Sequence, residues 1–241
     1  MKTVLITGAS RGIGRELALA FGKAGYAVGV NCQKEKAKAE AVVQEIYEAG
    51  NKEAEVFVCD VRDSIKVRQM VDGMVVRWGH LDVLVNNAGL TRDRTLLKMT
   101  NAEWNDVIDV NLSGAFWCLR EAARVMSQEK SGHVINVASI MAMKPGFGNA
   151  NYSASKAGLV ALTKAAAREL GRFHITVNVV LPGFHETEMS ASLPPEHKKK
   201  VIDEHALGAS TRVEDLCRVV LELAQNPSVS GQLFNVDSRV I

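Results

Sequence analysis

The sequence lacks two features that mark whole classes of proteins: a surplus of charge and closely spaced cysteines. Lysine and arginine number 29 against 27 aspartates and glutamates, so the chain has no strong overall field for holding nucleic acid or an anionic membrane. Its four cysteines are far apart and form no C-x-x-C pair, which fits buried, reduced thiols. Any charged partner must therefore be met by a local patch.

Signals for export, membrane insertion and metal binding are also missing. The opening run MKTVLITGAS turns polar too early for a signal peptide, and no stretch is apolar enough to cross a bilayer. The six histidines show neither H-x-x-x-H nor mixed Cys/His spacing, so we expect no metal site. These absences predict a soluble cytoplasmic protein.

What the sequence does contain is an alternation of short apolar runs with longer segments of helical period, such as 12–24, 34–49 and 64–78. The runs are apolar nearly throughout, as in a parallel sheet covered by helices on both faces. No repeat or linker divides the chain. We predict an α/β fold in one domain, 1–241, with a doubly wound seven-stranded sheet; the runs are 2–7, 26–31, 54–60, 81–87, 132–139, 175–182 and 232–236.

The first run ends in TGASRGIG, which places Gly8, Gly12 and Gly14 between a strand and a helix. Glycines there let the backbone approach a pyrophosphate that sits on the N–H groups of the helix start. The spacing differs from the commoner G-x-G-x-x-G, and a P-loop lysine is missing. The position after the first strand favours a dinucleotide site.

The second run ends in neutral residues, Asn31, Cys32 and Gln33, where a site for NAD usually has an acid for the ribose 2′-hydroxyl. A 2′-phosphate would not be repelled there. Arg11 can supply a planar guanidinium to that phosphate, the alternative being a solvated loop arginine. The pattern predicts a preference for NADPH.

Further motifs complete a family resemblance that spans nearly the whole chain. TGASRGIG, the DV at 60–61, the NNAG at 86–89, Asn111, Ser139, YSASK and the PG at 182–183 together resemble a short-chain dehydrogenase/reductase with a Rossmann fold. NNAGLTRDRTLLKM and ITVNVVLPGFHETEM are most similar to bacterial 3-oxoacyl-acyl-carrier-protein reductases. The resemblance implies NADPH-dependent reduction of a 3-oxoacyl thioester, with acyl carrier protein as a partner.

The resemblance also implies which residues touch the cofactor. Asp60 would accept from the adenine amino group beside Val61, and Thr187 would hydrogen-bond the nicotinamide carboxamide or the pyrophosphate. Each has an ordinary alternative as a turn or helix-capping residue. The full implied set is Gly8, Ser10, Arg11, Gly12, Ile13, Gly14, Asn31, Cys32, Asp60, Val61, Asn87, Ala88, Gly89, Tyr152, Lys156, Pro182, Gly183, His185 and Thr187. His185 replaces the aliphatic residue usual at its position.

Tyr152 and Lys156 lie four residues apart, on one face of a predicted helix. A ketone that accepts hydride needs a proton, and an ammonium beside the phenol should lower the tyrosine pKa toward neutrality. Ser139 would hold the carbonyl oxygen. By the resemblance, Asn111 would hold a water that relays protons to Lys156. Each residue alone is as easily structural, but together they predict a catalytic set.

Three alternatives for the function remain open: reduction of carrier-bound 3-oxoacyl thioesters, reduction of acyl-CoA or another ketone, and a non-catalytic dinucleotide sensor, against which the intact catalytic set argues. The resemblance places a variable substrate lid at about 186–208. An acidic carrier would meet basic side chains expected around the cleft mouth, namely Arg92, Arg94, Lys98, Lys130 and Arg172.

Assembly is expected from the helix ASKAGLVALTKAAARELG, which has small or apolar residues on more of its surface than one core-facing stripe requires. We predict a homotetramer, or at least a dimer, against the alternative of a helix enclosed within its own domain. The C-terminus departs from the resembling proteins, which commonly end with aspartate or asparagine and two glycines. This chain instead reads FNVDSRVI.

Overall fold

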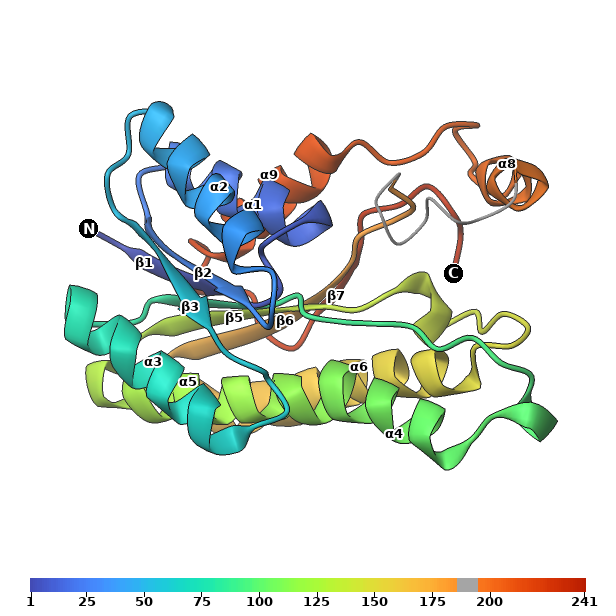
Figure 1. The fold of residues 1–241 in the computed structure, drawn as a ribbon, viewed down its shortest axis with the longest axis horizontal. Coiled ribbons are helices and arrows are strands. Elements are labelled where there is room, and N and C mark those ends of the chain that lie inside the picture. Colours follow the sequence, from blue (N-terminus) through green and yellow to red (C-terminus); the bar gives the residue numbers. More distant parts are fainter. Residues whose placement is uncertain (186–194) are drawn as a thin grey trace.

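The strands form one parallel sheet in the order β3-β2-β1-β4-β5-β6-β7 (Figure 1). The computed structural model describes residues 1–185 and 195–241. The strands are β1 (Thr3–Ile6), β2 (Ala27–Cys32), β3 (Ala54–Val58), β4 (Val83–Asn86), β5 (Gly132–Val137), β6 (Ile175–Leu181) and β7 (Leu233–Asn235). Each falls inside or within a residue of a predicted run, so the predicted sheet is confirmed.

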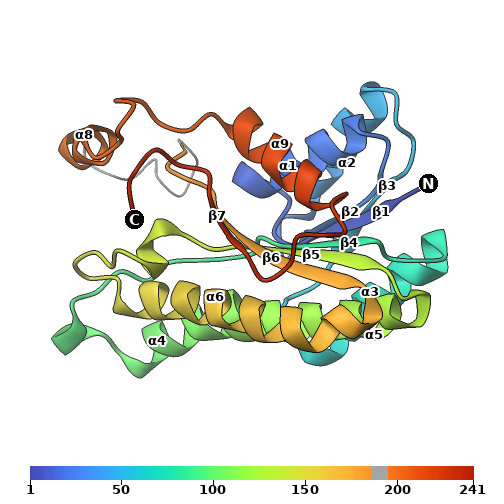
Figure 2. The same cartoon turned by 180° about the vertical axis from the view of Figure 1, so that it is seen from behind.

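Helices cover both faces of this sheet, as Figures 1 and 2 show from opposite sides. One layer holds α1 (Gly12–Lys23), α2 (Lys36–Glu48) and α9 (Val213–Leu223), and the other holds α3 (Ser64–Trp78), α5 (Ala115–Glu129) and α6 (Ala150–Leu170). The shorter α4 (Asn101–Ile108) packs beside α6, and α8 (Pro195–Asp203) lies apart, near the C-terminus.

The sheet is the centre of the core, and every residue of β1, β2, β4 and β6 is buried. Successive side chains alternate between the two helical layers: Val4 and Ile6 pack in the cluster under α1, whereas Leu5 packs with α3 and α5 residues. The four cysteines are buried and unpaired, as predicted. Among residues 1–185 and 195–241, no helix is both long and apolar enough to span a bilayer.

The helix N-termini differ in how they are capped. Asp63 caps α3 by accepting from Ile65 N and Lys66 N, each at 3.1 Å, and Thr100 forms a capping box with Glu103 at α4. By contrast, Arg11 at the N-cap of α1 makes no side-chain cap hydrogen bond, and the first turn contains no acid. The start of α1 is therefore suited to an external anion.

Candidate active site

β1 pairs in parallel with β2 on one side and with β4 on the other. From this pair the strands follow one another along the chain in opposite directions across the sheet. In doubly wound sheets, ligands bind beyond the carboxyl ends of the strands at this switch point. The glycine loop follows β1, and Asn87, Ala88 and Gly89 follow β4. The topology therefore brings these two predicted segments to one crevice.

The glycine loop and the NNAG turn touch one another. Gly8 has φ +63°, and a Cβ there would lie 2.9 Å from the Cα of Ala88. At Gly14, a Cβ would lie 2.4 Å from Gly8 O and 2.5 Å from Asn87 Nδ2. Asn87 Nδ2 donates to Thr7 O at 2.9 Å and to Gly8 O at 3.1 Å, which ties the turn to the loop. These glycines are required by close approach.

A cavity of about 490 Å³ opens beside the start of α1. Four consecutive candidates of the glycine loop line it, together with His185 from the segment after β6; the four are Ser10, Arg11, Gly12 and Ile13. The cavity extends toward α2, where Lys38 and Glu45 contribute to the wall. Tyr152 is not among the residues that line this cavity.

Asn31 and Cys32 end β2 as buried residues, each 2% exposed. The Asn31 amide links β2 to the loop after β1 and to the end of β3: Oδ1 accepts from Gly8 N at 3.2 Å, while Nδ2 donates to Phe57 O at 3.0 Å and Cys59 O at 3.1 Å. Burial raises the pKa of the Cys32 thiol. These side chains shape the loop from inside, so any effect of Asn31 on a 2′-phosphate would be indirect.

The sequence analysis missed an acid close to Arg11. Glu35 Oε2 lies 3.6 Å from Arg11 Nη1, and Glu35 Oε1 lies 3.2 Å from Lys38 Nζ. Both partners of the Arg11 pair are partly exposed, so the pair contributes little to stability. Its importance is local, because a carboxylate here would compete with any phosphate for the guanidinium. Glu35 follows the neutral residues Asn31, Cys32 and Gln33 by two positions, so this carboxylate could have been identified from the sequence.

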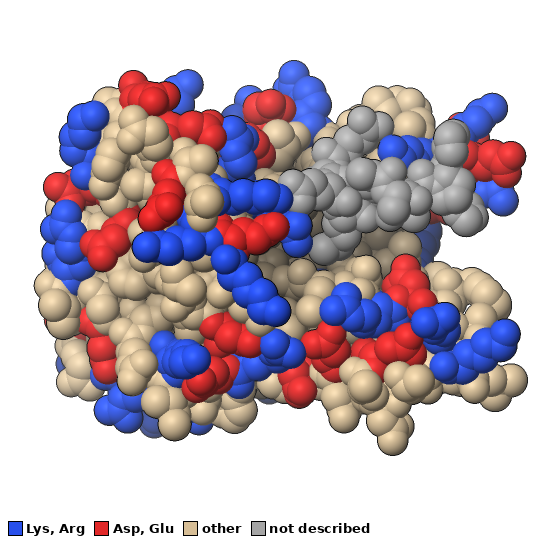
Figure 3. Space-filling model, viewed as in Figure 1, with Lys and Arg blue, Asp and Glu red and all other residues tan. Residues whose placement is uncertain are grey.

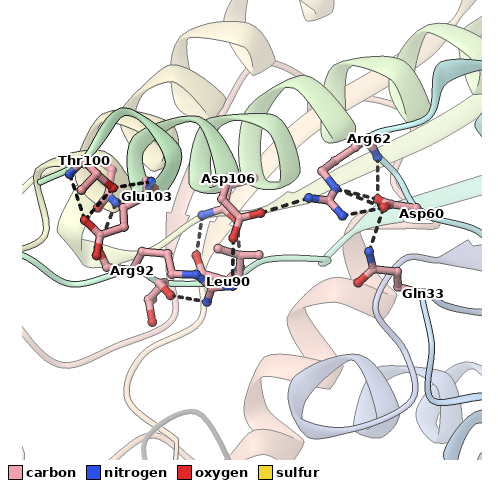
Figure 4. A network of polar contacts seen from close by, with 11 residues as sticks. Gln33, Asp60, Arg62, Leu90, Arg92, Thr100, Glu103 and Asp106 are labelled. Carbon is pink, nitrogen blue, oxygen red and sulfur yellow. Dashed lines mark hydrogen bonds and ion pairs between the residues drawn. The ribbon is translucent and has the colours of Figure 1, made fainter.

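Asp60 stands at the end of a chain of charged contacts that Figure 4 shows. Arg62 and Gln33 each donate to Asp60 Oδ2 at 2.7 Å, and the Arg62 hydrogen bond is the main cause that lowers the Asp60 pKa to about 2. The carboxylate is therefore ionised at neutral pH and able to accept from an amino group. Val61, next to it, is 6% exposed and packs where a Cβ on Gly114 would clash.

Tyr152 in the first turn of α6 meets Ser139, which follows β5. The phenol lies beside the Ser139 side chain, whose Oγ accepts from Met141 N at 3.2 Å. Burial raises the Tyr152 pKa, the Ser139 hydroxyl opposes that rise, and the charge of Asp93 adds to it. The predicted lowering by Lys156 is therefore not what the structure gives, because burial outweighs the favourable groups. The phenol keeps its proton at neutral pH.

Lys156 lies one turn further along α6, 4% exposed, with Nζ 5.7 Å from the Tyr152 ring centroid. Nζ donates to Val137 O at 2.8 Å, at the end of β5. Burial lowers the pKa of this amine to about 8. A group with that pKa is mostly charged at neutral pH yet close to releasing a proton.

Asn111 lies in the π-helix Asp109–Gly114, an irregular turn of the kind found at functional sites. Its side chain is 1% exposed: Oδ1 accepts from Leu90 N at 2.9 Å, and Nδ2 donates to Leu90 O at 3.0 Å and Ser155 Oγ at 3.1 Å. Ser155 in turn donates to Tyr152 O at 2.7 Å. Ser155 was not singled out from the sequence, although its hydrogen bond joins Asn111 to α6.

Gly89 completes this contact region, since a Cβ there would lie 3.4 Å from Asn111 Oδ1 and 3.7 Å from Lys156 Nζ. Pro182 and Gly183 follow β6 at the same edge, with Gly183 at φ +87° against Thr211. His185 Nε2 lies 2.6 Å from Pro182 O, so its ring folds back on this turn. Thr187 lies outside the described residues, as does part of the expected lid at 186–208.

The basic residues expected around the mouth are divided between opposite edges of the sheet. Arg92, Arg94 and Lys98 follow β4, on the side of Tyr152. Arg92 pairs with Asp106 at 2.8 Å and Arg94 with Glu103 at 3.0 Å. Lys130 and Arg172 instead precede β5 and β6. That placement corrects the expectation, because a helix that starts at the carboxyl edge of a parallel sheet returns the chain to the amino edge.

The fold and the residues gathered at its switch point define an oxidoreductase of the dinucleotide-binding α/β class. The profile of the short chain dehydrogenase family matches residues 2–198, and the chain belongs to this family. A solved structure of a short-chain type dehydrogenase/reductase from Mycobacterium marinum superposes with a TM-score of 0.93 at 34% identity, covering 98% of this chain and 94% of that chain.

Curated relatives extend the likeness over the full length. The chain is 43% identical over 238 residues to the 3-oxoacyl-[acyl-carrier-protein] reductase FabG of Staphylococcus aureus, covering 98% of this chain and 96% of that protein. It is 40% identical over 243 residues to the 3-oxoacyl-[acyl-carrier-protein] reductase of Synechocystis sp., covering 100% and 97%. The family resemblance inferred from the sequence motifs is therefore confirmed.

Proposed function

We propose that the protein uses NADPH to reduce the ketone of a 3-oxoacyl thioester, carried on acyl carrier protein, to the 3-hydroxyacyl thioester. The observation that carries the proposal is the meeting of Ser139, Tyr152 and Lys156 at the carboxyl edge of the sheet, with the phenol beside Ser139 and Lys156 Nζ 5.7 Å from the Tyr152 ring centroid. Relatives that bear the name of this activity at 40–43% identity support the choice of substrate class.

The residues divide the chemistry between them. NADPH, when bound, supplies the hydride. Ser139 donates a hydrogen bond to the ketone oxygen as negative charge develops there. Tyr152, whose pKa is raised by burial, holds its proton at neutral pH and passes it to that oxygen. The Lys156 ammonium stabilises the phenolate left behind, and the hydrogen bonds of Asn111 fix the π-helix against α6.

The glycine loop fits a dinucleotide on independent grounds. Close approach at Gly8 and Gly14 keeps side chains out of the crevice, and the start of α1 has no acid and no side-chain cap. Arg11 lines the cavity at the start of α1, and we assign it the 2′-phosphate. Glu35 limits this preference because its carboxylate lies 3.6 Å from Arg11.

A second candidate is reduction of acyl-CoA or another ketone. It is favoured by the pairing of Arg92 and Arg94 with Asp106 and Glu103, which leaves less positive field for an acidic carrier. Positive and negative side chains are also interspersed over the face shown in Figure 3. The experiment that separates the candidates compares NADPH oxidation with acetoacetyl-carrier protein, acetoacetyl-CoA and a panel of simple ketones. Highest catalytic efficiency on the carrier-bound substrate supports the proposal.

We also propose a homotetramer, or at least a dimer, joined partly through α6. Ala154, Ala157, Ala161 and Ala165 form an exposed stripe of small side chains along this helix, which allows close packing of a second copy. The molar mass in solution at micromolar concentration tests the assembly, and a strictly monomeric mass would contradict it.

A further inference from the structure

The end of the chain contains a buried group of charges outside the catalytic set. Asp237 follows β7 at the carboxyl edge of the sheet, and Arg239 comes two residues later. Together with His205, which follows α8, they form what we term the C-terminal cluster. The side chains of His205 and Asp237 are 0% exposed and that of Arg239 is 6% exposed. Charges buried this completely need partners.

The Asp237 carboxylate is held by two segments of the chain. Its Oδ2 accepts from Arg239 Nε at 2.7 Å and lies 2.5 Å from Arg239 Nη2, while Oδ1 accepts from the Arg239 backbone N at 3.1 Å. Oδ1 also lies 2.8 Å from His205 Nε2. The carboxylate therefore joins the C-terminal residues to the segment that leaves α8.

The His205 ring lies between a backbone carbonyl and the Asp237 carboxylate. Nδ1 lies 2.6 Å from Val201 O, which can only accept, so this nitrogen carries a proton. Nε2 faces the carboxylate at 2.8 Å, although its direction is not that of a regular hydrogen bond. The His205 ring and the Arg239 guanidinium therefore lie against different oxygens of one carboxylate.

Other contacts connect the cluster to both loops of the candidate site. Ala206 N donates to Ser238 O at 3.1 Å, and Lys144, in the loop after Ser139, donates through Nζ to Val240 O. Asp237 also acts on His185, after β6, since its charge opposes the lowering of the His185 pKa that burial causes. The tail thus lies between the segment after α8 and the two loops that bear Ser139 and His185.

Burial of three ionisable groups is an inefficient way to gain stability, because replacing such a group with apolar residues is often neutral or stabilising. Its value lies in fixing one arrangement. We propose that His205, Asp237 and Arg239 are positioning residues, which hold the tail against the loops of Ser139 and His185 and so keep the substrate side of the site in its productive shape. This assignment rests on the proposed reductase function.

A triple variant, His205→Leu with Asp237→Leu and Arg239→Met, removes all the charges without leaving one unpaired. We expect it to fold with an unchanged or higher melting temperature and to bind NADPH normally. Its KM for acetoacetyl thioester should rise about tenfold with a smaller change in kcat, because the substrate wall loses its fixed position. Wild-type KM and kcat in this folded variant would overturn the proposal.

Two further variants separate positioning from general destabilisation. The single substitution Arg239→Lys keeps a cation beside Asp237, so its KM should stay close to that of the wild type. Arg218→Met is the matched control: this arginine pairs with Asp215 on α9, and its side chain is 71% exposed. It should leave KM unchanged. An equal rise of KM in Arg218→Met and the triple variant would contradict the assignment.

Hydrogen exchange tests the cluster independently of activity. The amides of Ala206 and Leu207 donate to Ser238, so they should be protected in the wild type and about tenfold less protected in the triple variant. Equal protection overturns the proposal, whereas a wild type that reduces no thioester overturns only the proposed function.

Discussion

Two buried groups of polar residues lie at the same edge of the sheet, and they differ in whether a buried charged side chain has a partner of opposite charge. In the catalytic set, Lys156 is 4% exposed and donates to a backbone carbonyl, and burial lowers its pKa to about 8. In the C-terminal cluster, Asp237 is enclosed between Arg239 and His205. In the first group burial shifts the pKa of Lys156 toward neutrality, whereas in the second the carboxylate is enclosed by its partners.

Burial of an ionisable side chain has a different consequence in each of the two groups. A lysine without a carboxylate partner in a low-dielectric site loses its proton more readily, which suits proton transfer. A carboxylate that is bound by a guanidinium on one oxygen and lies against an imidazole ring on the other fixes the geometry of the segments it joins. We therefore expect changes in the first group to affect kcat most, and changes in the second to affect KM.

The largest effect is expected for Tyr152→Phe. The variant should fold and bind NADPH, yet carbonyl reduction should fall roughly 10²–10⁴-fold because the proton donor is gone. Ser155→Ala is the control, since it removes a hydroxyl that holds Tyr152 O and Asn111 without touching the phenol. It should have a clearly smaller effect. Near-normal turnover by Tyr152→Phe would mean that another group donates the proton.

The next effect concerns cofactor choice. Arg11→Ala should reduce the preference for NADPH over NADH by roughly 1.5–3 kcal/mol, the worth of one hydrogen bond to a charged group. Glu35→Gln should change it in the opposite direction, because the carboxylate 3.6 Å from Arg11 is removed. Catalytic efficiencies with both cofactors measure the preference. Equal efficiency with NADPH and NADH in the unmutated protein would refute the assignment.

The pH dependence should report on Lys156. Its ammonium is present below the pKa of about 8 and lost above it, so the rate of reduction should fall as pH rises through that value. The alkaline limb should approach about tenfold per pH unit. Between about 8 and 10.5 the unfolded chain binds the extra proton, so this group makes folding stability rise with pH. Lys156→Met should remove that contribution, measured by denaturant unfolding.

The smallest effect tests the carrier. Charge reversal of Arg92 and Lys98, on the catalytic edge, should raise KM for the carrier-bound substrate about threefold and affect the CoA thioester much less, with the difference weakened by salt. Reversal of Lys130 and Arg172, on the opposite edge of the same chain, is the matched comparison. Equal losses on both substrates would remove the carrier protein from the proposal.

Much of the fold followed from the sequence because the apolar runs and the helical periods are strong signals. The glycine loop, the NNAG turn and the set of Ser139, Tyr152 and Lys156 were also predicted to converge, since carboxyl ends of parallel strands meet at one edge. The structure brings them together as expected. The order and spacing of the motifs therefore predicted both the sheet topology and the main candidate site residues.

Other features depend on how deeply a side chain is buried and on the edge of the sheet at which it lies. The spacing of motifs in the sequence determines neither. Burial decides that the Tyr152 pKa is raised, although the neighbouring lysine pointed the other way. The edge at which Lys130 and Arg172 lie follows only from the completed topology. The C-terminal cluster joins residues 205 and 237, so no local pattern could predict it. The related signal in the sequence was the ending DSRVI, which differs from the ending expected by the family resemblance.

The most direct test of the central claim is NADPH oxidation by the purified wild type with acetoacetyl-carrier protein, measured beside the Tyr152→Phe variant. The account predicts rapid oxidation by the wild type, formation of an equal amount of 3-hydroxybutyryl thioester, and loss of turnover with retained NADPH binding in the variant. Binding of NADPH without oxidation on the carrier thioester, the CoA thioester or any simple ketone would contradict it.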